Sequence, residues 1–463
     1  MLNLANGSIK NIALTDGSVS LTYGDLIDFS VGGIEGDSLV GLVMNRDLAT
    51  AVLYLTLLKE GISIALLDPT TSQLPWFDNP TLFIPTILSS TDNPELLVGD
   101  RKRFCLKNSN LFCYYLFSSN RGDSLKPKLV RNEQFVTINT SGSTGIPKLV
   151  CITSENLISN TQAICKALSL TEQDSSITTL PLHYTYGLSI LNTHLYSGGT
   201  VYLTNTSVLD PKFSTLSDGF RPSTFSGVPY LYQLEKKLEY VDLRKPYLKR
   251  LTQAGGRLET LIQQEVLEVS ASNQLDFYVM YGQTEATARI SAFNLVERPN
   301  KLGSVGLPVG DTKIYTIPGN SSKELPGEIY VSGSGVTPGY INAWNNKFDY
   351  LEYQRSLHTG DLGYIDSEGY LFITGRSSRI AKLAGKRFNL DQVELQLIKN
   401  YKHNFTLVSD DSCIYACTEG QYSGKIRIEG IHPKHISIKT NISIPRKSNG
   451  KVDYTQLLNI VLL

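Results

Sequence analysis

The 463-residue sequence lacks any charge imbalance, because 43 lysine and arginine residues match 43 aspartate and glutamate residues. Without a net field, the chain has no general attraction for nucleic acid or for an anionic membrane. Long hydrophobic runs are also missing. The longest run near the N-terminus, residues 48–58, is shorter than the about 20 residues that cross a bilayer. We expect a buried helix there, and neither nucleic-acid binding nor membrane insertion.

Cysteine is scarce, with six residues scattered along the chain and no spacing typical of a disulfide framework or a zinc site. The first residues lack the basic start and the long apolar run of a signal peptide. These absences favour reduced, structural cysteines and a cytoplasmic location.

Alternating apolar segments in the first part of the chain predict a parallel sheet. Residues 38–44 and 62–67 are short and apolar, as in strands, and the mostly apolar stretch 47–59 between them has the length of a helix. A strand, a helix and a strand in this order are typical of a crossover unit. A length of 463 residues exceeds one compact core and predicts two or three domains.

Later segments indicate a different architecture. A helix is expected over residues 155–168, with Ser154 as its cap. Residues 328–372 alternate short strand patterns with glycine-rich turns, which indicates a β-rich subdomain. After Gly375 we expect one helix, residues 391–399, and short strands.

The strongest local signal for chemistry is the run from Thr140 to Lys148, which reads TSGSTGIPK and follows a strand-like segment, residues 135–139. Hydroxyls and backbone amides with little side-chain bulk suit polyphosphate oxygens, and the lysine adds a positive charge. The spacing is not that of a Walker motif, because Gly-Lys-Ser/Thr is absent. Taken alone, the run also fits a flexible Ser/Gly turn. Its candidate phosphate-binding residues are Thr140, Ser141, Gly142, Ser143, Thr144, Gly145 and Lys148.

Further motifs follow in a fixed order, and together they resemble the acyl-adenylate-forming (AMP-binding) superfamily of acyl-CoA synthetases, peptide-synthetase adenylation domains and luciferases. They are LTYGDL at 21–26, PLHYTYGL at 181–188, GVP at 227–229, YGQTE at 281–285, the segment 327–340, HTGD at 358–361, GR at 375–376 and PRKSNGK at 445–451. The likeness covers essentially the whole chain. It implies an α/β fold: a large N-terminal domain of parallel-type sheets with helices and a β-rich subdomain, residues 1–375, then a small, mobile α+β domain, residues 376–463.

The resemblance implies an enzyme that uses ATP and Mg²⁺ to convert a small carboxylic acid into an acyl-adenylate, releasing pyrophosphate. The acyl group would then pass to a thiol, either of coenzyme A or of the phosphopantetheine on a separate carrier protein. A carboxylate with a pKa near 4 is already ionised at neutral pH, so the first step needs no general base. It needs cations that stabilise the charge developing at phosphorus.

The resemblance also assigns roles to individual residues. Glu285 would hold Mg²⁺, Thr284 and Lys148 would contact phosphate, and Lys451 would bridge the carboxylate and the α-phosphate. Asp361 would accept hydrogen bonds from both ribose hydroxyls, a task suited to an acceptor-only carboxylate. The remaining predicted ATP-binding residues are Gly255, Gly256, Tyr281, Gly282, Gln283 and Arg376.

The acyl pocket is the least defined part. Its candidate lining residues are Tyr184, Gly187, Val228, Gly255 and Gly282, and none of them identifies an acid. Ser378 and Arg379 depart from the residues common at the family's hinge, and the C-terminal part is short. These departures leave the acceptor open. Two alternatives therefore stand: an adenylate-forming enzyme that transfers to an amine, and a catalytically silent binding protein on the same fold.

Overall fold

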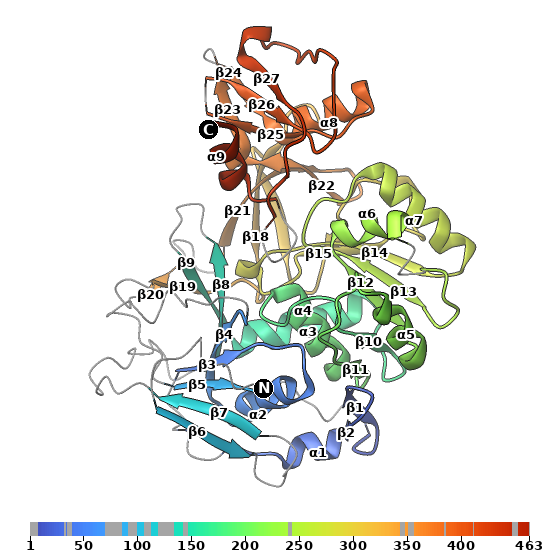
Figure 1. Cartoon of the computed structure of the whole chain (residues 1–463), viewed down its shortest axis with the longest axis vertical. Helices are drawn as coiled ribbons and strands as arrows, with labels where there is room; N and C mark the ends of the chain where they lie inside the picture. The colour runs from blue at the N-terminus through green and yellow to red at the C-terminus, as the bar shows by residue number, and fades with distance from the viewer. Residues whose placement is uncertain are drawn as a thin grey trace. The chain divides into compact units, whose positions relative to one another are not determined.

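The computed structural model describes fourteen stretches of the chain: residues 8–31, 34, 39–69, 86–90, 100–105, 113–118, 134–141, 147–238, 243–342, 348–350, 356–383, 386–410, 412–446 and 452–462. Its internal contacts form two compact units (Figure 1). Unit 1 comprises Met1–Lys313 and Val331–Leu357, and unit 2 comprises Ile314–Tyr330 and His358–Leu463. Unit 2 is therefore assembled from two separate stretches of sequence. The α/β fold expected from the sequence is confirmed, whereas the functional boundary at residues 375 and 376 stays a prediction.

One sheet of unit 1 carries most of the predicted ligand-binding segments. Its described order is β16-β15-β14-β13-β12-β10-β11-β1-β2, and neighbours from β10 to β14 run parallel. The strands are β1 (Ile12–Thr15), β2 (Ser20–Thr22), β10 (Ser175–Ile177), β11 (Thr200–Tyr202), β12 (Thr224–Gly227), β13 (Arg250–Gln253), β14 (Asp276–Tyr281), β15 (Ser291–Asn294) and β16 (Leu307–Pro308). Parallel neighbours require crossovers, which α5 (Pro211–Phe220), α6 (Pro229–Leu238) and α7 (Thr260–Ser272) help to supply.

The second sheet of unit 1 has the described order β20-β19-β9-β8-β4-β3-β5-β7-β6. Its strands are β3 (Leu39–Val43), β4 (Ser63–Leu67), β5 (Thr86–Ser89), β6 (Asp100–Cys105), β7 (Cys113–Ser118), β8 (Phe135–Ser141), β9 (Pro147–Thr153), β19 (Gly339–Asn342) and β20 (Phe348–Tyr350). Strands β3 and β4 pair in parallel, and α2 (Leu48–Lys59) connects them. The predicted crossover unit and the buried helix at residues 48–58 are confirmed.

Helices pack between the two sheets of unit 1. Figure 1 shows α3 (Ser154–Ala167) beside α4 (Thr185–Tyr196), and their side chains join strands of both sheets, α1 (Tyr23–Asp28) and α2 in one apolar core. The predicted cap of α3 is wrong by one residue. Thr153 is the cap: its hydroxyl accepts from the Asn156 amide, and the Asn156 side chain accepts from the Thr153 amide.

Unit 2 contains a β-rich part and a small α+β part. The described strands β17 (Lys313–Ile317), β18 (Gly327–Ser332), β21 (Ser356–Ile365) and β22 (Leu371–Arg376) form one sheet. The strand-rich character expected for residues 328–372 is confirmed, but these residues are not one subdomain, because β19 and β20 belong to the second sheet of unit 1. The α+β part contains β23 (Ile380–Leu383), β24 (Lys386–Asn389), β25 (Thr406–Ser409), β26 (Ile414–Cys417), β27 (Ile436–Lys439), α8 (Leu390–Tyr401) and α9 (Tyr454–Leu462).

Two helices cover the two faces of the sheet β25-β26-β27, although the sequence predicted only one helix there. Leu407 faces the apolar cluster of α8, and its neighbour Val408 faces the cluster of α9, as expected from the alternation of side chains along a strand. Helix α9 contributes Leu457 and Val461 to the second cluster. The prediction of a single helix was wrong because this second apolar face is formed only in the folded unit.

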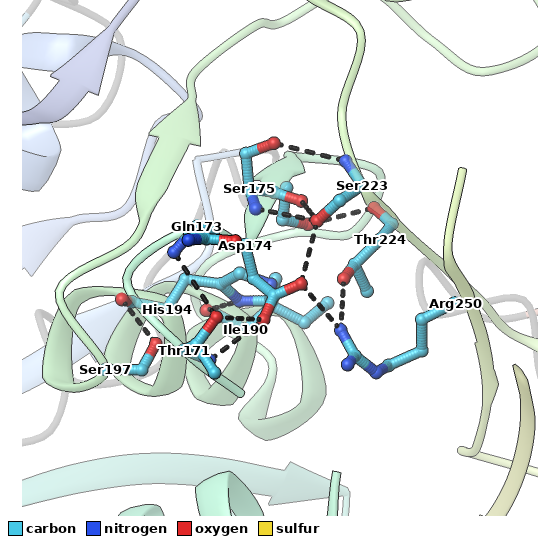
Figure 2. Close-up of polar contacts among 11 residues, drawn as sticks. Thr171, Gln173, Asp174, Ser175, Ile190, His194, Ser197, Ser223, Thr224 and Arg250 are labelled. Carbon is cyan, nitrogen blue, oxygen red and sulfur yellow. Dashed lines mark hydrogen bonds and ion pairs between the residues drawn. The ribbon is translucent and has the colours of Figure 1, made fainter. Parts of the chain in front are cut away.

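A buried polar cluster lies within the first sheet of unit 1 (Figure 2). Arg250 forms an ion pair with Asp174 at 3.2 Å, and Asp174 also accepts hydrogen bonds from the Thr171 amide at 2.8 Å and the Ser223 hydroxyl at 3.1 Å. Burial alone raises the pKa of Asp174, but these hydrogen bonds and the charge of Arg250 outweigh it, and the pKa is lowered. Nearby, burial lowers the pKa of His194 to about 4.

Across the described segments, no helix combines the length and the apolar character that crossing a membrane requires. Among the cysteines whose side chains the structure describes, Cys151, Cys165, Cys413 and Cys417 are free thiols. Burial raises the pKa of Cys151 and of Cys165 to about 12, so both thiols stay protonated at neutral pH. This agrees with the structural role expected for them.

Candidate active site

The carboxyl ends of three parallel strands meet at one edge of the first sheet. Gly227 of β12 pairs with Gln253 of β13, and Gln253 pairs with Val279 of β14, so the segments that follow these strands emerge side by side. Ligands bind at this edge in open α/β sheets. The emerging segments carry the predicted residues Val228, Gly255, Gly256, Tyr281, Gly282, Gln283, Thr284 and Glu285.

Two of these glycines are required by their surroundings. Gly255 has a φ of +86°, and a Cβ added to it would lie 2.7 Å from the hydroxyl oxygen of Tyr184. A Cβ added to Gly282 would lie 1.8 Å from the carbonyl oxygen of Ala288. Any larger residue at either position would push these groups apart. The structure thus brings the main chain at Gly255 against Tyr184, two residues predicted to line the acyl pocket.

Tyr184 and Tyr186 have different surroundings. Tyr184 precedes the first turn of α4 and is half-buried, and it packs against an apolar cluster that contains Val228. Tyr186 is buried and donates a hydrogen bond to the Thr252 carbonyl at 2.9 Å, so it is a packing aromatic. A Cβ on Gly187 would lie 2.1 Å from the Pro181 carbonyl oxygen, so backbone fills the space beside it; its role in the pocket stays a prediction.

Glu285 is held by neighbours from a distant part of unit 1. The Tyr340 hydroxyl donates to the Glu285 carboxylate at 3.4 Å, and the Thr337 amide donates to the Glu285 carbonyl at 2.9 Å. Burial, and then the charge of Glu285, raises the pKa of Tyr340, so this tyrosine remains a donor. Thr284 lies 3.4 Å from Thr185, hydroxyl to hydroxyl, at the start of α4. The turn is therefore fixed from two sides.

The half-buried carboxylate of Glu285 suits a magnesium ion. Hard oxygen ligands are those that Mg²⁺ prefers, and it is usually bound by one or two carboxylates together with substrate phosphates. Within the described residues, no group of three or more His, Cys, Asp or Glu side chains could hold a metal by itself. Glu285 therefore fits a site in which one carboxylate binds the magnesium ion and the phosphates of the nucleotide supply further oxygen ligands.

In unit 2, the predicted ribose and phosphate residues meet on two paired strands. Asp361 of β21 is opposite Arg376 of β22, and the Arg376 Nε donates to an Asp361 carboxylate oxygen at 3.0 Å. The Asp361 side chain is buried, whereas that of Arg376 is 56% exposed. The ion pair therefore orients the Asp361 carboxylate. The Arg376 amide donates to Asp391 at 3.0 Å, which ties this strand end to α8.

Part of the predicted site lies outside the described residues. These are Gly142, Ser143, Thr144, Gly145 and Lys451, together with the side chains of Thr140, Ser141 and Lys148. The backbone of β8 and β9 is described on both sides of the phosphate-loop motif, and Ser141 pairs with Pro147 in antiparallel register. The motif therefore joins the two strands of a hairpin. Its contacts with phosphate stay a prediction, as does the role of Lys451.

Sequence reasoning missed Tyr340, Thr185 and Arg289. Tyr340 contacts Glu285 although 55 positions separate them, and no local pattern distinguishes it among 25 tyrosines. Thr185 lies inside the PLHYTYGL motif, but a threonine there predicts a helix start as readily as a contact. Arg289 offered a usable signal, because it is a single charge in the apolar run that follows YGQTE.

The model of the family described as AMP-binding enzyme matches residues 92–341, more than half of the chain, and the chain belongs to that family. Among curated relatives, an oxalate–CoA ligase from Arabidopsis thaliana is 30% identical over 276 residues, covering 56% of this chain and 51% of the relative. A D-alanine–D-alanyl carrier protein ligase from Bacillus velezensis is 27% identical over 279 residues, covering 57% of this chain and 54% of the relative. The chain thus spans about half the length of these curated relatives.

A solved structure extends the likeness of fold to nearly the whole chain. The o-succinylbenzoate CoA synthetase of Bacillus subtilis, in complex with an acyl-adenylate intermediate, gives a TM-score of 0.71. Its sequence is 19% identical, and the match covers 98% of this chain and 96% of that chain. Another structure of the same synthetase contains ATP and a magnesium ion. At this identity the likeness defines the α/β fold with its small C-terminal α+β part.

Proposed function

We propose that the chain is an ATP-dependent ligase that activates a small carboxylic acid as an acyl-adenylate and then transfers the acyl group to a thiol. One observation carries the proposal: in a member of the AMP-binding family, Gly255, Gly282 and Glu285 emerge together at the carboxyl edge of one parallel sheet. This edge offers close approach of the main chain for a nucleotide base and a carboxylate for magnesium.

The first step forms a bond between a carboxylate oxygen of the acid and the α-phosphorus of ATP, and pyrophosphate leaves. Glu285 would hold the magnesium ion that neutralises phosphate charge, and Lys451 would supply a second positive charge at the reacting centre. Asp361, oriented by Arg376, would accept hydrogen bonds from the ribose. In the second step a thiolate attacks the acyl carbon, and AMP leaves.

Lys451 would be carried by a C-terminal domain, residues 376–463, that moves relative to residues 1–375. Such a movement lets one lysine act in adenylation and then withdraw before the thiol arrives. We place the reaction in the cytoplasm, because the cysteines whose side chains the structure describes are free thiols.

Carboxylate-dependent exchange of pyrophosphate into ATP tests adenylation. Lys451→Ala is expected to lower the exchange rate by about 10²–10³, as for the loss of one preorganised charge partner. Lys434→Ala, at an exposed lysine in the same unit, is the matched control and should retain the wild-type rate. Exchange that Lys451→Ala leaves unchanged contradicts the role of this lysine. No exchange with any acid favours the silent binding protein.

Trials with different acceptors distinguish acyl transfer to a thiol from acyl transfer to an amine. Relatives include ligases named for coenzyme A and one named for a carrier protein, and both acceptors present the same phosphopantetheine thiol. Acyl transfer should therefore be detected with coenzyme A or with a loaded carrier protein. Transfer to amines alone would favour the alternative acceptor.

A further inference from the structure

Arg289 is a buried cation without a buried anion. The residue is 4% exposed and lies between the turn that carries Glu285 and the start of β15. Its guanidinium lies 4.1 Å from the centre of the Tyr186 ring and donates to the Ala288 carbonyl at 3.2 Å and the Ser189 hydroxyl at 3.4 Å. Its Nε faces the Met280 sulfur at 3.3 Å. None of these groups carries a negative charge.

No ion pair to Arg289 exists within the described parts of the chain, and the aromatic group beside its charge is the Tyr186 ring. Burial lowers the pKa of Arg289, yet a guanidinium is not deprotonated at neutral pH. Burying such a charge without a counter-charge is unfavourable, and a contact with one aromatic ring offsets only part of that cost. A ligand anion would supply what the protein does not.

The backbone of Arg289 is fixed independently of its charge. The Asn160 side-chain amide donates to the Arg289 carbonyl at 2.8 Å, and the Asn160 side-chain oxygen accepts from the Arg289 amide at 3.1 Å. Asn160 lies on α3 and is 3% exposed. The side chain is therefore presented from a rigid position, as a preformed binding group requires.

The neighbours of the guanidinium belong to the same apolar cluster as two candidate residues of the acyl pocket. Tyr186, Met280 and Ala288, which contact the guanidinium, lie in one cluster with Tyr184. The Tyr184 hydroxyl lies against the main chain at Gly255. Tyr184 further packs with Val228 and Ala288 in one apolar cluster. Arg289 is thus linked to the candidate pocket residues Tyr184 and Val228 through the neighbours that its side chain contacts.

We propose that Arg289 binds a second negatively charged group at the far end of the acid, so that the substrate is a dicarboxylic acid. One carboxylate is activated at the nucleotide, and the other pairs with the guanidinium in the two-pronged geometry that arginine favours. This inference rests on the proposed function for the identity of the pocket. It assigns the acid class that the sequence left open.

Binding to the full-length protein tests the inference without relying on catalysis. The probes are a graded series of aliphatic dicarboxylic acids and the benzenedicarboxylic acids, each compared with its monomethyl ester in the presence of AMP. The wild-type protein should be stabilised against thermal unfolding by at least one diacid and bind it about a hundredfold more tightly than its half-ester. If no diacid is distinguished from its half-ester, the inference is overturned.

Variants then test whether Arg289 is responsible for the preference for the diacid over its half-ester. Arg289→Met should lose the preference for the diacid while binding AMP as the wild type does, and Arg289→Lys should restore part of it. Arg298→Met, at an exposed arginine, is the matched control and should keep the full preference. A preference that survives in Arg289→Met, or an equal loss of AMP binding, contradicts the proposal. If Arg289→Met does not fold, the half-ester comparison and Arg289→Lys decide it.

Pyrophosphate exchange separates this inference from the proposed function. A diacid that binds through Arg289 but supports no exchange leaves the inference standing and removes the ligase activity. Exchange with monocarboxylic acids at rates that Arg289→Met does not change leaves the ligase activity standing and removes the inference.

Discussion

Two arginines of unit 1 are buried almost equally, Arg250 at 5% exposure and Arg289 at 4%, but their surroundings differ. Arg250 faces the carboxylate of Asp174, which further hydrogen bonds hold in place (Figure 2). Arg289 faces an aromatic ring, a hydroxyl, a carbonyl and a sulfur atom. The charge of Arg250 is neutralised by a carboxylate of the protein, whereas the proposed counter-charge of Arg289 is a carboxylate of the substrate. Burial alone therefore does not distinguish a structural charge from a ligand-binding one, whereas the partner does.

The largest effect is expected from breaking the Arg250 pair. Arg250→Met leaves the Asp174 carboxylate buried without its cation, which should lower the free energy of unfolding by about 3–5 kcal/mol. Urea unfolding measures it. The double variant Asp174→Asn with Arg250→Met should recover part of the loss. A loss below about 1 kcal/mol in the single variant would put Arg250 in the same class as Arg289.

A pH-dependent effect is expected from His194 in the same cluster. Its ring Nδ1 lies 2.9 Å from the Ile190 carbonyl, its Nε2 has no partner in the described structure, and burial lowers its pKa from 6.5 to about 4. The unfolded chain therefore binds the proton first. Stability should be complete above pH 6.5 and fall as the pH drops towards 4, with His194 responsible for about 3 kcal/mol.

Comparing His194→Gln with the wild type separates the contribution of His194 to the pH-dependent loss of stability from the contributions of other titratable groups. The variant should show a shallower loss of unfolding free energy between pH 6.5 and pH 4. Equal slopes for both proteins would contradict the assignment of a neutral, buried imidazole.

A smaller effect is expected at the support of Arg289. Asn160→Ala leaves the amide and the carbonyl of Arg289 buried without partners, at a cost of about 1–3 kcal/mol. Because the guanidinium also loses its fixed position, the KM for the acid should rise more than the KM for ATP. A variant with both constants raised equally would indicate general loosening of unit 1.

The smallest effect on stability is expected from Arg289 itself. Without ligand, Arg289→Met removes a buried charge that has no counter-charge, so the free energy of unfolding should stay within about 1 kcal/mol of the wild type or increase. Thermal unfolding of the ligand-free protein tests this. A loss as large as that of Arg250→Met would show that the fold already neutralises the Arg289 charge.

The sequence predicts those parts of the molecule that depend on local patterns. Strand β3, helix α2 and strand β4 form where the sequence predicts them, because apolar periodicity and length determine such a unit. Helix α9 was missed, since its nine residues acquire an apolar partner only when Leu457 packs near Val408.

In the candidate site, too, the sequence identifies residues that belong to contiguous motifs but not the contacts between distant residues. The glycines and Glu285 are identifiable because their motif is contiguous, and Asp361 and Arg376 belong to motifs that β21 and β22 bring together. The contacts of Glu285 with Tyr340, and of Arg289 with Tyr186, join residues far apart in sequence. No local spacing encodes them, since they arise from how α4, β14 and β19 pack.

The interrupted path of the chain through unit 2 matters during synthesis. Strands β17 and β18 leave the ribosome first, but the next strand of their sheet, β21, begins roughly two dozen residues after β18 ends. At translation rates of about 5–20 residues per second, the nascent pair keeps an open hydrogen-bonding edge for one to several seconds. An exposed edge of this kind invites pairing with other chains. Slower translation through residues 333–355 should therefore lower the yield of soluble protein.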